Sequence, residues 1–214
     1  MYTNHTPLFP QGVVSQYHYD NFSIDESILE SVEVGKNINN ILTSQRESKA
    51  NENIFDNPNF NNIQQFCRRS LEHYFSEIEK ISVEEFWFSA SWVNFCFPEG
   101  FQEFHNHANS IYSGCFYIDA DSTQPGLTFK RENRNHDPYF KLYDKRDNIF
   151  HADEATLQVK SGDLILFPSY MVHGHDKNTS QKTRISLAFN VLLNQPEDKA
   201  PPGWYHVRFK NNGN

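Results

Sequence analysis

Residues 183–193, TRISLAFNVLL, are the stretch that decides the fold. Apolar and polar side chains alternate along it, which is the pattern of a β-strand with one face in the core. One face carries Ile185, Leu187, Phe189 and Val191, and the other carries Arg184, Ser186, Ala188 and Asn190. Because Ala188 keeps the middle of the second face small, we interpret that face as the wall of a cavity.

Other short segments strengthen this interpretation. Residues 162–169, GDLILFPS, are typical of a tight turn that leads into an apolar strand ending at a proline. Further runs rich in Phe, Tyr, Val and Ile lie at 84–97, 110–120, 126–131, 155–160 and 204–209. Between them the polar segment 132–154 forms a long excursion, which is interpreted either as a lid over a functional site or as a disordered insertion.

Helical patterns lie before residue 82. Apolar residues recur every three or four positions over 61–80, which places them on one face of a helix. A weaker helical pattern covers 24–43 and is interrupted by Gly35. The sequence therefore predicts a single domain over 1–214 of the α+β class, mainly β, with helices packed on one face of a sandwich or small barrel.

Composition limits the classes of function. The 214 residues carry a net charge of −8, so the surface disfavours nucleic acid. No apolar run is long enough for a membrane span, and the first residues do not resemble a secretory signal. The three cysteines have no CxxC spacing, which suggests reduced thiols in a cytoplasmic protein. The oligomeric state cannot be read from the sequence, which is compatible with a homodimer.

Four of the ten histidines form two HxH pairs, His105 with His107 and His173 with His175. In an extended segment, residues i and i+2 point the same way, so two imidazoles can reach one metal ion. A single pair is weak support, because solvated or hydrogen-bonded histidines at a loop would have the same spacing. Eleven residues after His173, Arg184 and Ser186 share a strand face on which a guanidinium and a hydroxyl could hold a carboxylate.

This order of motifs resembles the iron(II)- and 2-oxoglutarate-dependent oxygenases. More narrowly, it is similar to a small 2OG-Fe(II) oxygenase group that is common in marine bacteria and phages. The resemblance covers roughly residues 86–193. It rests on segments that share their order with the family, namely SWVN (91–94), HNH (105–107), YSGCFY (112–117), GDLILFP (162–168), His173 and RISLAFN (184–190).

The resemblance implies a double-stranded β-helix, or jelly-roll, with a helical part over about 1–82 and a core over about 83–210. It implies that His105, His107 and His173 bind Fe(II), and that Arg184 and Ser186 bind the far carboxylate of 2-oxoglutarate. Asn94 and Tyr117, on neighbouring strands, are weaker candidates for contact with the same cosubstrate. The implied reaction uses O2 to hydroxylate a small-molecule or peptide substrate, with release of succinate and CO2.

One position departs from the family's usual pattern. The common ligand set is two histidines and one carboxylate, whereas His107 occupies the place of the carboxylate. A site of three histidines is chemically reasonable, because imidazole suits Fe(II). Alternatively, Glu103 or Asp176 supplies a carboxylate, and His175 is either a supporting residue or simply exposed.

Two other readings remain open. A cupin-like metal enzyme with three histidines fits, because Gly100 before one HxH and Gly162 to His173 approximate cupin motifs. However, such an enzyme has no need of a carboxylate anchor at Arg184. A non-catalytic jelly-roll binding module is the other alternative, although it has no reason to gather three histidines and Arg184 around one cavity.

Overall fold

Two antiparallel sheets form the framework of the protein in a computed structural model, which describes residues 12–44, 53–131, 152–199 and 208–210. The six-stranded sheet has the order β1 (Ser15–His18), β8 (Asp163–Pro168), β5 (Tyr112–Asp119), β10 (Arg184–Asn194), β3 (Glu85–Cys96) and β2 (Ile41–Thr43). The four-stranded sheet has the order β4 (Gln102–His105), β9 (Val172–His175), β6 (Leu127–Lys130) and β7 (Glu154–Leu157). This mainly β architecture is the predicted jelly-roll.

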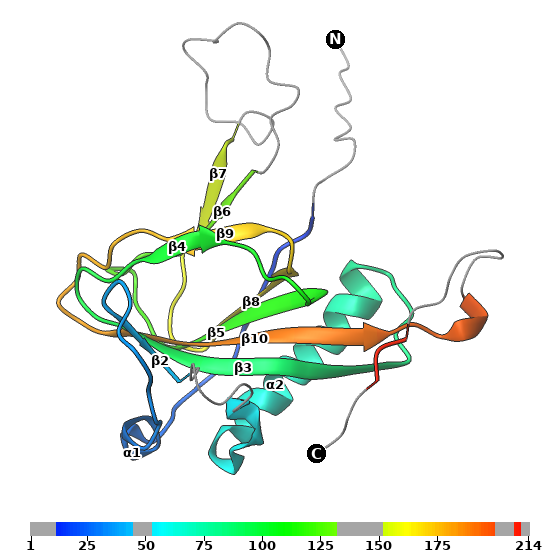
Figure 1. Cartoon of the computed structure of the whole chain (residues 1–214), viewed down its shortest axis with the longest axis horizontal. Coiled ribbons are helices and arrows are strands. Elements are labelled where there is room, and N and C mark those ends of the chain that lie inside the picture. Colours follow the sequence, from blue (N-terminus) through cyan, green and yellow to red (C-terminus); the bar gives the residue numbers. More distant parts are fainter. Residues whose placement is uncertain (1–11, 45–52, 132–151, 200–207, 211–214) are drawn as a thin grey trace, which may run out of the picture.

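Helices are few and lie mostly before β3. They are α1 (Glu26–Glu30), the short turns η1 (Ile54–Asp56) and η2 (Pro58–Phe60), α2 (Asn61–His73) with its π-helical extension η3 (Tyr74–Ile78), and η4 (Glu197–Lys199). Figure 1 shows α2 on the opposite side of the six-stranded sheet from β4 and β9. Within the described residues, no helix is both long and apolar enough to cross a membrane.

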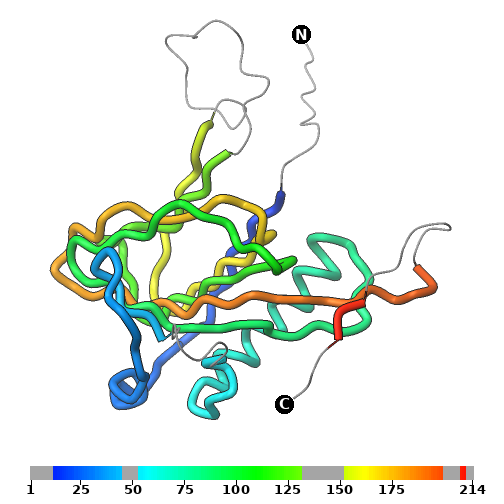
Figure 2. Tube along the Cα trace, viewed as in Figure 1, coloured from blue at the N-terminus to red at the C-terminus, as the bar shows by residue number. Residues whose placement is uncertain are grey.

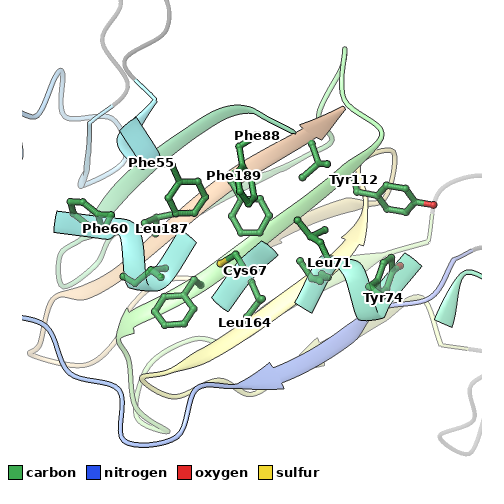
Figure 3. Close-up of a cluster of buried hydrophobic side chains, with 14 of the residues drawn as sticks. Phe55, Phe60, Cys67, Leu71, Tyr74, Phe88, Tyr112, Leu164, Leu187 and Phe189 are labelled. Carbon is green, nitrogen blue, oxygen red and sulfur yellow. The ribbon is translucent and has the colours of Figure 1, made fainter. Parts of the chain in front are cut away.

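The larger core lies between α2 and the outer face of the six-stranded sheet. The apolar stripe of α2, with Ile63, Cys67 and Leu71, packs against residues such as Phe189 and Leu187 of β10. Figure 3 shows Cys67 and Leu71 among the side chains that meet Leu187 and Phe189 between the helix and the strands. Phe189 also covers Gly114, where an added Cβ would lie only 2.2 Å from the ring. The predicted helix over 61–80 is confirmed as α2 and η3.

A smaller apolar cluster lies between the two sheets. Its buried members are Tyr117, Ala120, Leu127, Phe129, Val159, Ile165 and Phe167. This cluster fills one part of the space between the sheets, and a cavity occupies another part.

The predicted helix over 24–43 is wrong beyond its first turns. Helix α1 ends at Glu30, and the chain then turns sharply at Asn39 and Asn40, which both have positive φ angles. A helix cannot continue through residues with positive φ, which asparagine tolerates better than most residues, so the predicted helix could not extend to residue 43. The following residues form β2, which pairs with β3.

The N-terminal part also contributes β1, which pairs with β8 almost 150 residues later, as the blue and yellow segments of Figure 2 show. The expected helical part therefore supplies two edge strands as well as helices. The predicted excursion over 132–154 lies outside the described residues except for 152–154. The predicted strand over 204–209 also lies mostly outside them, and residues 208–210 carry no strand.

Candidate metal and cosubstrate site

The cavity lies between the two sheets, with a volume of about 70 Å³. The six-stranded sheet contributes Trp92, Asn94, Cys96, Gly114, Cys115, Phe167, Arg184, Ser186, Ala188 and Ile41. The four-stranded sheet and its loops contribute Gln102, His105, His107, Leu127, His173, Gly174 and His175. The cavity thus brings together all the predicted site residues except Tyr117.

Three of these residues, His105, His107 and His173, form what we call the histidine cluster. His105 ends β4 and lies directly opposite His173 in the pairing with β9, while His107 follows two residues after His105. One ring nitrogen from each lies within 4.8 Å of the others, and the ring centroids are 4.6–5.1 Å apart. The two HxH pairs therefore contribute unequally, since the first supplies two members of the cluster and the second supplies one.

Hydrogen bonds fix the direction in which two of these rings point. His105 Nδ1 lies 2.8 Å from the carbonyl oxygen of Glu103, and His173 Nδ1 lies 2.9 Å from that of Met171. A carbonyl can only accept, so each Nδ1 carries the hydrogen and donates it. Each Nε2 is then left with a free lone pair, which is the form of histidine that binds a metal.

The free nitrogens of His105 and His107 face each other. Their Nε2 atoms are 3.1 Å apart, while His107 Nδ1 lies 2.6 Å from the Oδ1 atom of Asn190. With both Nδ1 atoms protonated, two lone pairs point at the same small volume and repel each other. A cation between the rings removes that repulsion, so the donor set fits a metal ion that accepts imidazole nitrogen, such as Fe(II).

Two histidines of the cluster, His107 and His173, have pKa values that favour the neutral form. Burial lowers the pKa of His173 to about 3. Burial also lowers the pKa of His107, although the hydrogen bond that its ring donates to Asn190 partly opposes that shift. Neutral imidazoles are ready to bind a metal at pH 7 without first losing a proton.

No carboxylate joins the cluster among the described residues. Glu103 and Asp176, the two carboxylates considered from the sequence, are both exposed. Glu103 approaches the cluster only through its backbone carbonyl, which accepts from His105. The arrangement therefore favours three nitrogen ligands over a set that includes either of these carboxylates.

The opposite end of the cavity carries a buried positive charge. Arg184, the first residue of β10, is only 3% exposed, and no carboxylate of the described residues forms an ion pair with it. Its Nε has no hydrogen-bond partner among the residues that the structure describes. Its guanidinium lies over the ring of Tyr117, 4.8 Å from the ring centroid. A buried cation without a counter-ion is costly, so this end of the cavity is suited to an anion.

Strand register brings the remaining cosubstrate candidates to Arg184. Ser186 lies opposite Asn94 of β3 on one side and opposite Tyr117 of β5 on the other. Ser186 and Asn94 line the cavity, whereas Tyr117 is fully buried beside Arg184 and belongs to the smaller apolar cluster. Within the described part of the chain, the Oη atom of Tyr117 is buried without a hydrogen-bond partner, like the Nε of Arg184.

Sequence reasoning left His175 undecided, and the structure buries it. His175 is 5% exposed, lines the cavity, and donates from Nδ1 to the carbonyl of Asp176 at 2.9 Å. Burial, and then the charge of Arg184, lower its pKa to about 3. The expectation that His175 is simply exposed is therefore wrong. Its facing residue on β4, Gln102, also lines the cavity and had no sequence signal of its own.

Comparisons with known proteins agree with this geometry. Residues 90–190 match the sequence profile of a family described as "Putative 2OG-Fe(II) oxygenase". A search of the curated proteins finds no match.

Solved structures share the fold at low sequence identity. HygX from Streptomyces hygroscopicus, solved with nickel, 2-oxoglutarate and hygromycin B bound, is 11% identical over 80% of this chain and 76% of that chain, with a TM-score of 0.53. An oxidoreductase of the 2OG-Fe(II) oxygenase family from Burkholderia pseudomallei is 12% identical over 78% and 74%, with a TM-score of 0.52. The non-heme alpha ketoglutarate dependent epimerase SnoN from nogalamycin biosynthesis is 12% identical over 87% and 83%, with a TM-score of 0.53. Residues 90–190, just under half of the chain, thus match the 2OG-Fe(II) oxygenase family, and this match supports an oxidoreductase of the dioxygenase type.

Proposed function

We propose that the protein is an iron(II)- and 2-oxoglutarate-dependent oxygenase that hydroxylates a small-molecule or peptide substrate with O2 and releases succinate and CO2. One observation carries this proposal. A single cavity has three imidazoles converging at one end and, at the other, a buried arginine to which the described residues supply no counter-ion. The match of residues 90–190 to the oxygenase family supports the same cofactor and cosubstrate.

At the first end, His105, His107 and His173 would hold Fe(II) through their Nε2 atoms. When bound, Fe(II) with the keto acid of 2-oxoglutarate supplies the activation of O2 that oxidises a C–H bond. The chain's own part is to orient these imidazoles. The backbone carbonyls of Glu103 and Met171 do this for two of them.

At the second end, Arg184 would bind the far carboxylate of 2-oxoglutarate. A guanidinium presents several N–H donors that match both oxygens of a carboxylate. Ser186 and Asn94 lie beside it and could add further hydrogen bonds, and the unpartnered hydroxyl of Tyr117 is a fourth donor. The anion would also neutralise the buried charge, which the described residues leave uncompensated.

The two alternatives account for less of this cavity. A binding module leaves the converging lone pairs of the histidine cluster unexplained. A cupin-like metal enzyme explains the histidines and leaves the buried charge of Arg184 unexplained. The three cysteines, Cys67, Cys96 and Cys115, are free thiols, which supports placing the enzyme in the reducing cytoplasm.

The test is to add Fe(II) and then 2-oxoglutarate to the protein without oxygen, and to record the visible charge-transfer band of the chelate. We expect a band that requires both additions. Arg184→Ala should weaken 2-oxoglutarate binding by about 2 kcal/mol or more, roughly 30-fold, because a buried charge pair is lost. Arg208→Ala is the matched control, since Arg208 is an exposed arginine paired with Glu84 at 2.9 Å.

Each outcome separates the readings. Iron binding without any response to 2-oxoglutarate would favour the cupin-like enzyme. Binding of neither would favour the non-catalytic module. Loss of iron binding in His107→Ala, together with retention in Glu103→Ala and Asp176→Ala, would support the ligand set of three histidines.

A further inference from the structure

His107 is held differently from the other two members of the histidine cluster. His105 and His173 each donate from Nδ1 to a backbone carbonyl two residues earlier in the chain. His107 Nδ1 instead meets two side chains from distant strands, Asn190 Oδ1 on β10 at 2.6 Å and Ser113 Oγ on β5 at 2.9 Å. The third imidazole therefore depends on side chains for its orientation.

These two side chains belong to one buried network. Ser113 and Asn190 lie opposite each other in the β5–β10 pairing, and Ser113 Oγ lies 2.9 Å from Asn190 Oδ1. Ser169 Oγ lies 2.7 Å from Ser113 Oγ, and the backbone carbonyl of Ser169 accepts from the backbone N–H of His107 at 2.9 Å. Ser113 and Ser169 are both fully buried. The same few residues thus fix both the backbone and the ring of His107.

The hydroxyl groups of three serines donate their hydrogen bonds in a defined direction. We call Ser110, Ser169 and Ser113 the serine chain. Ser110 donates to the backbone carbonyl of Tyr112 at 2.9 Å, and Ser169 donates to Ser110 at 2.9 Å. The single hydroxyl hydrogen of Ser113 then has acceptors in Ser169 and Asn190, so Ser113 presents a lone pair to His107.

The chemistry of this network decides the tautomer of His107. Both atoms that face Nδ1 act as acceptors, so Nδ1 carries the hydrogen and Nε2 carries the free lone pair. With the opposite tautomer, Nε2–H would point into the cluster and could not bind a metal. A carboxylate at position 107 would have no second nitrogen to control and would need no such network.

We propose that Asn190 is the positioning residue that makes His107 a metal ligand, by holding Nδ1 protonated and aiming Nε2 at the other two imidazoles. The inference rests on the proposed function, in which the histidine cluster binds Fe(II). Asn190 acts only through His107, and the serine chain supports it by keeping Ser113 an acceptor.

The first test needs no metal. Nitrogen-15 NMR of the metal-free full chain reports which nitrogen of each histidine carries the hydrogen. We expect His107 to be protonated at Nδ1 in the wild type and in Asn190→Asp, which keeps an acceptor. In Asn190→Leu, which is similar in size and has no acceptor, the Nε2–H form should gain population. A wild-type His107 protonated at Nε2 would overturn the proposal whatever the metal does.

The second test is titration with Co(II) alone, followed by its visible absorption. Losing a hydrogen bond to a metal-bound histidine typically weakens metal affinity about 10- to 100-fold, and we expect this for Asn190→Leu. Asn190→Asp should stay within a few-fold of the wild type. Asn194→Leu is the matched control, because Asn194 is a buried asparagine of the same strand that bonds Phe209.

The decisive comparison repeats Asn190→Leu in a His107→Asp background. Because Asn190 acts through the imidazole, the substitution should change Co(II) affinity little there. An equal loss in both backgrounds would overturn the proposal and indicate a merely structural role. A wild type with the Nδ1–H tautomer that binds no Co(II) would instead refute the proposed function, and with it the assignment of His107 as a ligand.

Discussion

The two faces of strand β10 have different surroundings. On the outer face, Leu187, Phe189 and Val191 are fully buried against α2 and its neighbours. On the inner face, the polar or small residues Arg184, Ser186, Ala188 and Asn190 border the cavity or the histidine cluster. The residues of the two faces alternate in the sequence. The outer residues pack in the apolar core, whereas the inner residues lie beside polar groups.

This difference indicates how the protein divides stability from function. The outer face gains free energy from apolar burial. The inner face keeps a buried guanidinium and a set of facing lone pairs that have no full compensation until ligands bind. Substitutions on the two faces should therefore shift stability in opposite directions.

The largest effect is expected on the outer face. Phe189→Ala should lower the free energy of unfolding by about 3–5 kcal/mol, because a fully buried ring leaves a cavity. The ring packs directly over Gly114, which has no side chain to refill that space. Urea unfolding followed by circular dichroism measures the change. A loss below about 1 kcal/mol would contradict the division between the two faces.

Metal binding should stabilise the protein through the histidine cluster, which the inner face of β10 borders. At a free Co(II) concentration of about 100 times its dissociation constant, the free energy of unfolding should rise by about 2.7 kcal/mol. His173→Ala should lose this gain, while in the absence of metal it should unfold within about 1 kcal/mol of the wild type. Calorimetry with and without Co(II) measures both values. An equal gain in His173→Ala would place the metal elsewhere.

Removing the buried charge should make the ligand-free protein more stable. Arg184→Met keeps an extended apolar side chain and removes an ion that has no described counter-ion, so we expect a gain of about 1 kcal/mol. The lost contact with the ring of Tyr117 limits the gain. Chemical unfolding without 2-oxoglutarate measures it. A clear loss of stability would mean that Arg184 is a structural residue.

A separate effect concerns the pH dependence of stability in the metal-free protein. Burial holds the pKa of His173 and His175 at about 3, against an ordinary value of 6.5. Below pH 6.5 these two histidines bind protons in the unfolded chain, whereas in the folded chain they stay neutral down to about pH 3. Stability should therefore be complete above pH 6.5 and decline as the pH falls through that window.

The slope should be about 1.4 kcal/mol per pH unit for each of the two histidines. His175→Gln should reduce this slope by the contribution of one histidine. Urea unfolding at pH 4–7 can detect the change. Identical slopes in the wild type and His175→Gln would show that His175 is not titrating as a buried group.

The sequence could predict features that repeat along the chain. The alternation of β10 separated Leu187 and Phe189 from Arg184 and Ser186 correctly, because period two follows directly from strand geometry. The apolar stripe of α2 was predictable for the same reason. The HxH pairs pointed to His105, His107 and His173 because their spacing and order match a family pattern.

Features set by local backbone or by distant partners could not be predicted. The turn at Asn39 and Asn40 overrides an apolar pattern that suits a helix. Strands β4 and β9 are only four residues each and polar, so neither shows the alternation that marks a strand. Asn190 gains its role from His107, 83 residues earlier, and no local pattern signals that meeting.

The pairing of His105 with His173 has a consequence for assembly of the four-stranded sheet. A slip of one residue between two strands turns every side chain of one of them to the other face. The two histidines could then no longer meet, so only the correctly aligned pair of strands offers a complete set of nitrogens. Strands β4 and β9 come together across about 70 residues and pair over few positions. The bound ion would therefore stabilise the correct alignment of these two strands relative to a slipped one.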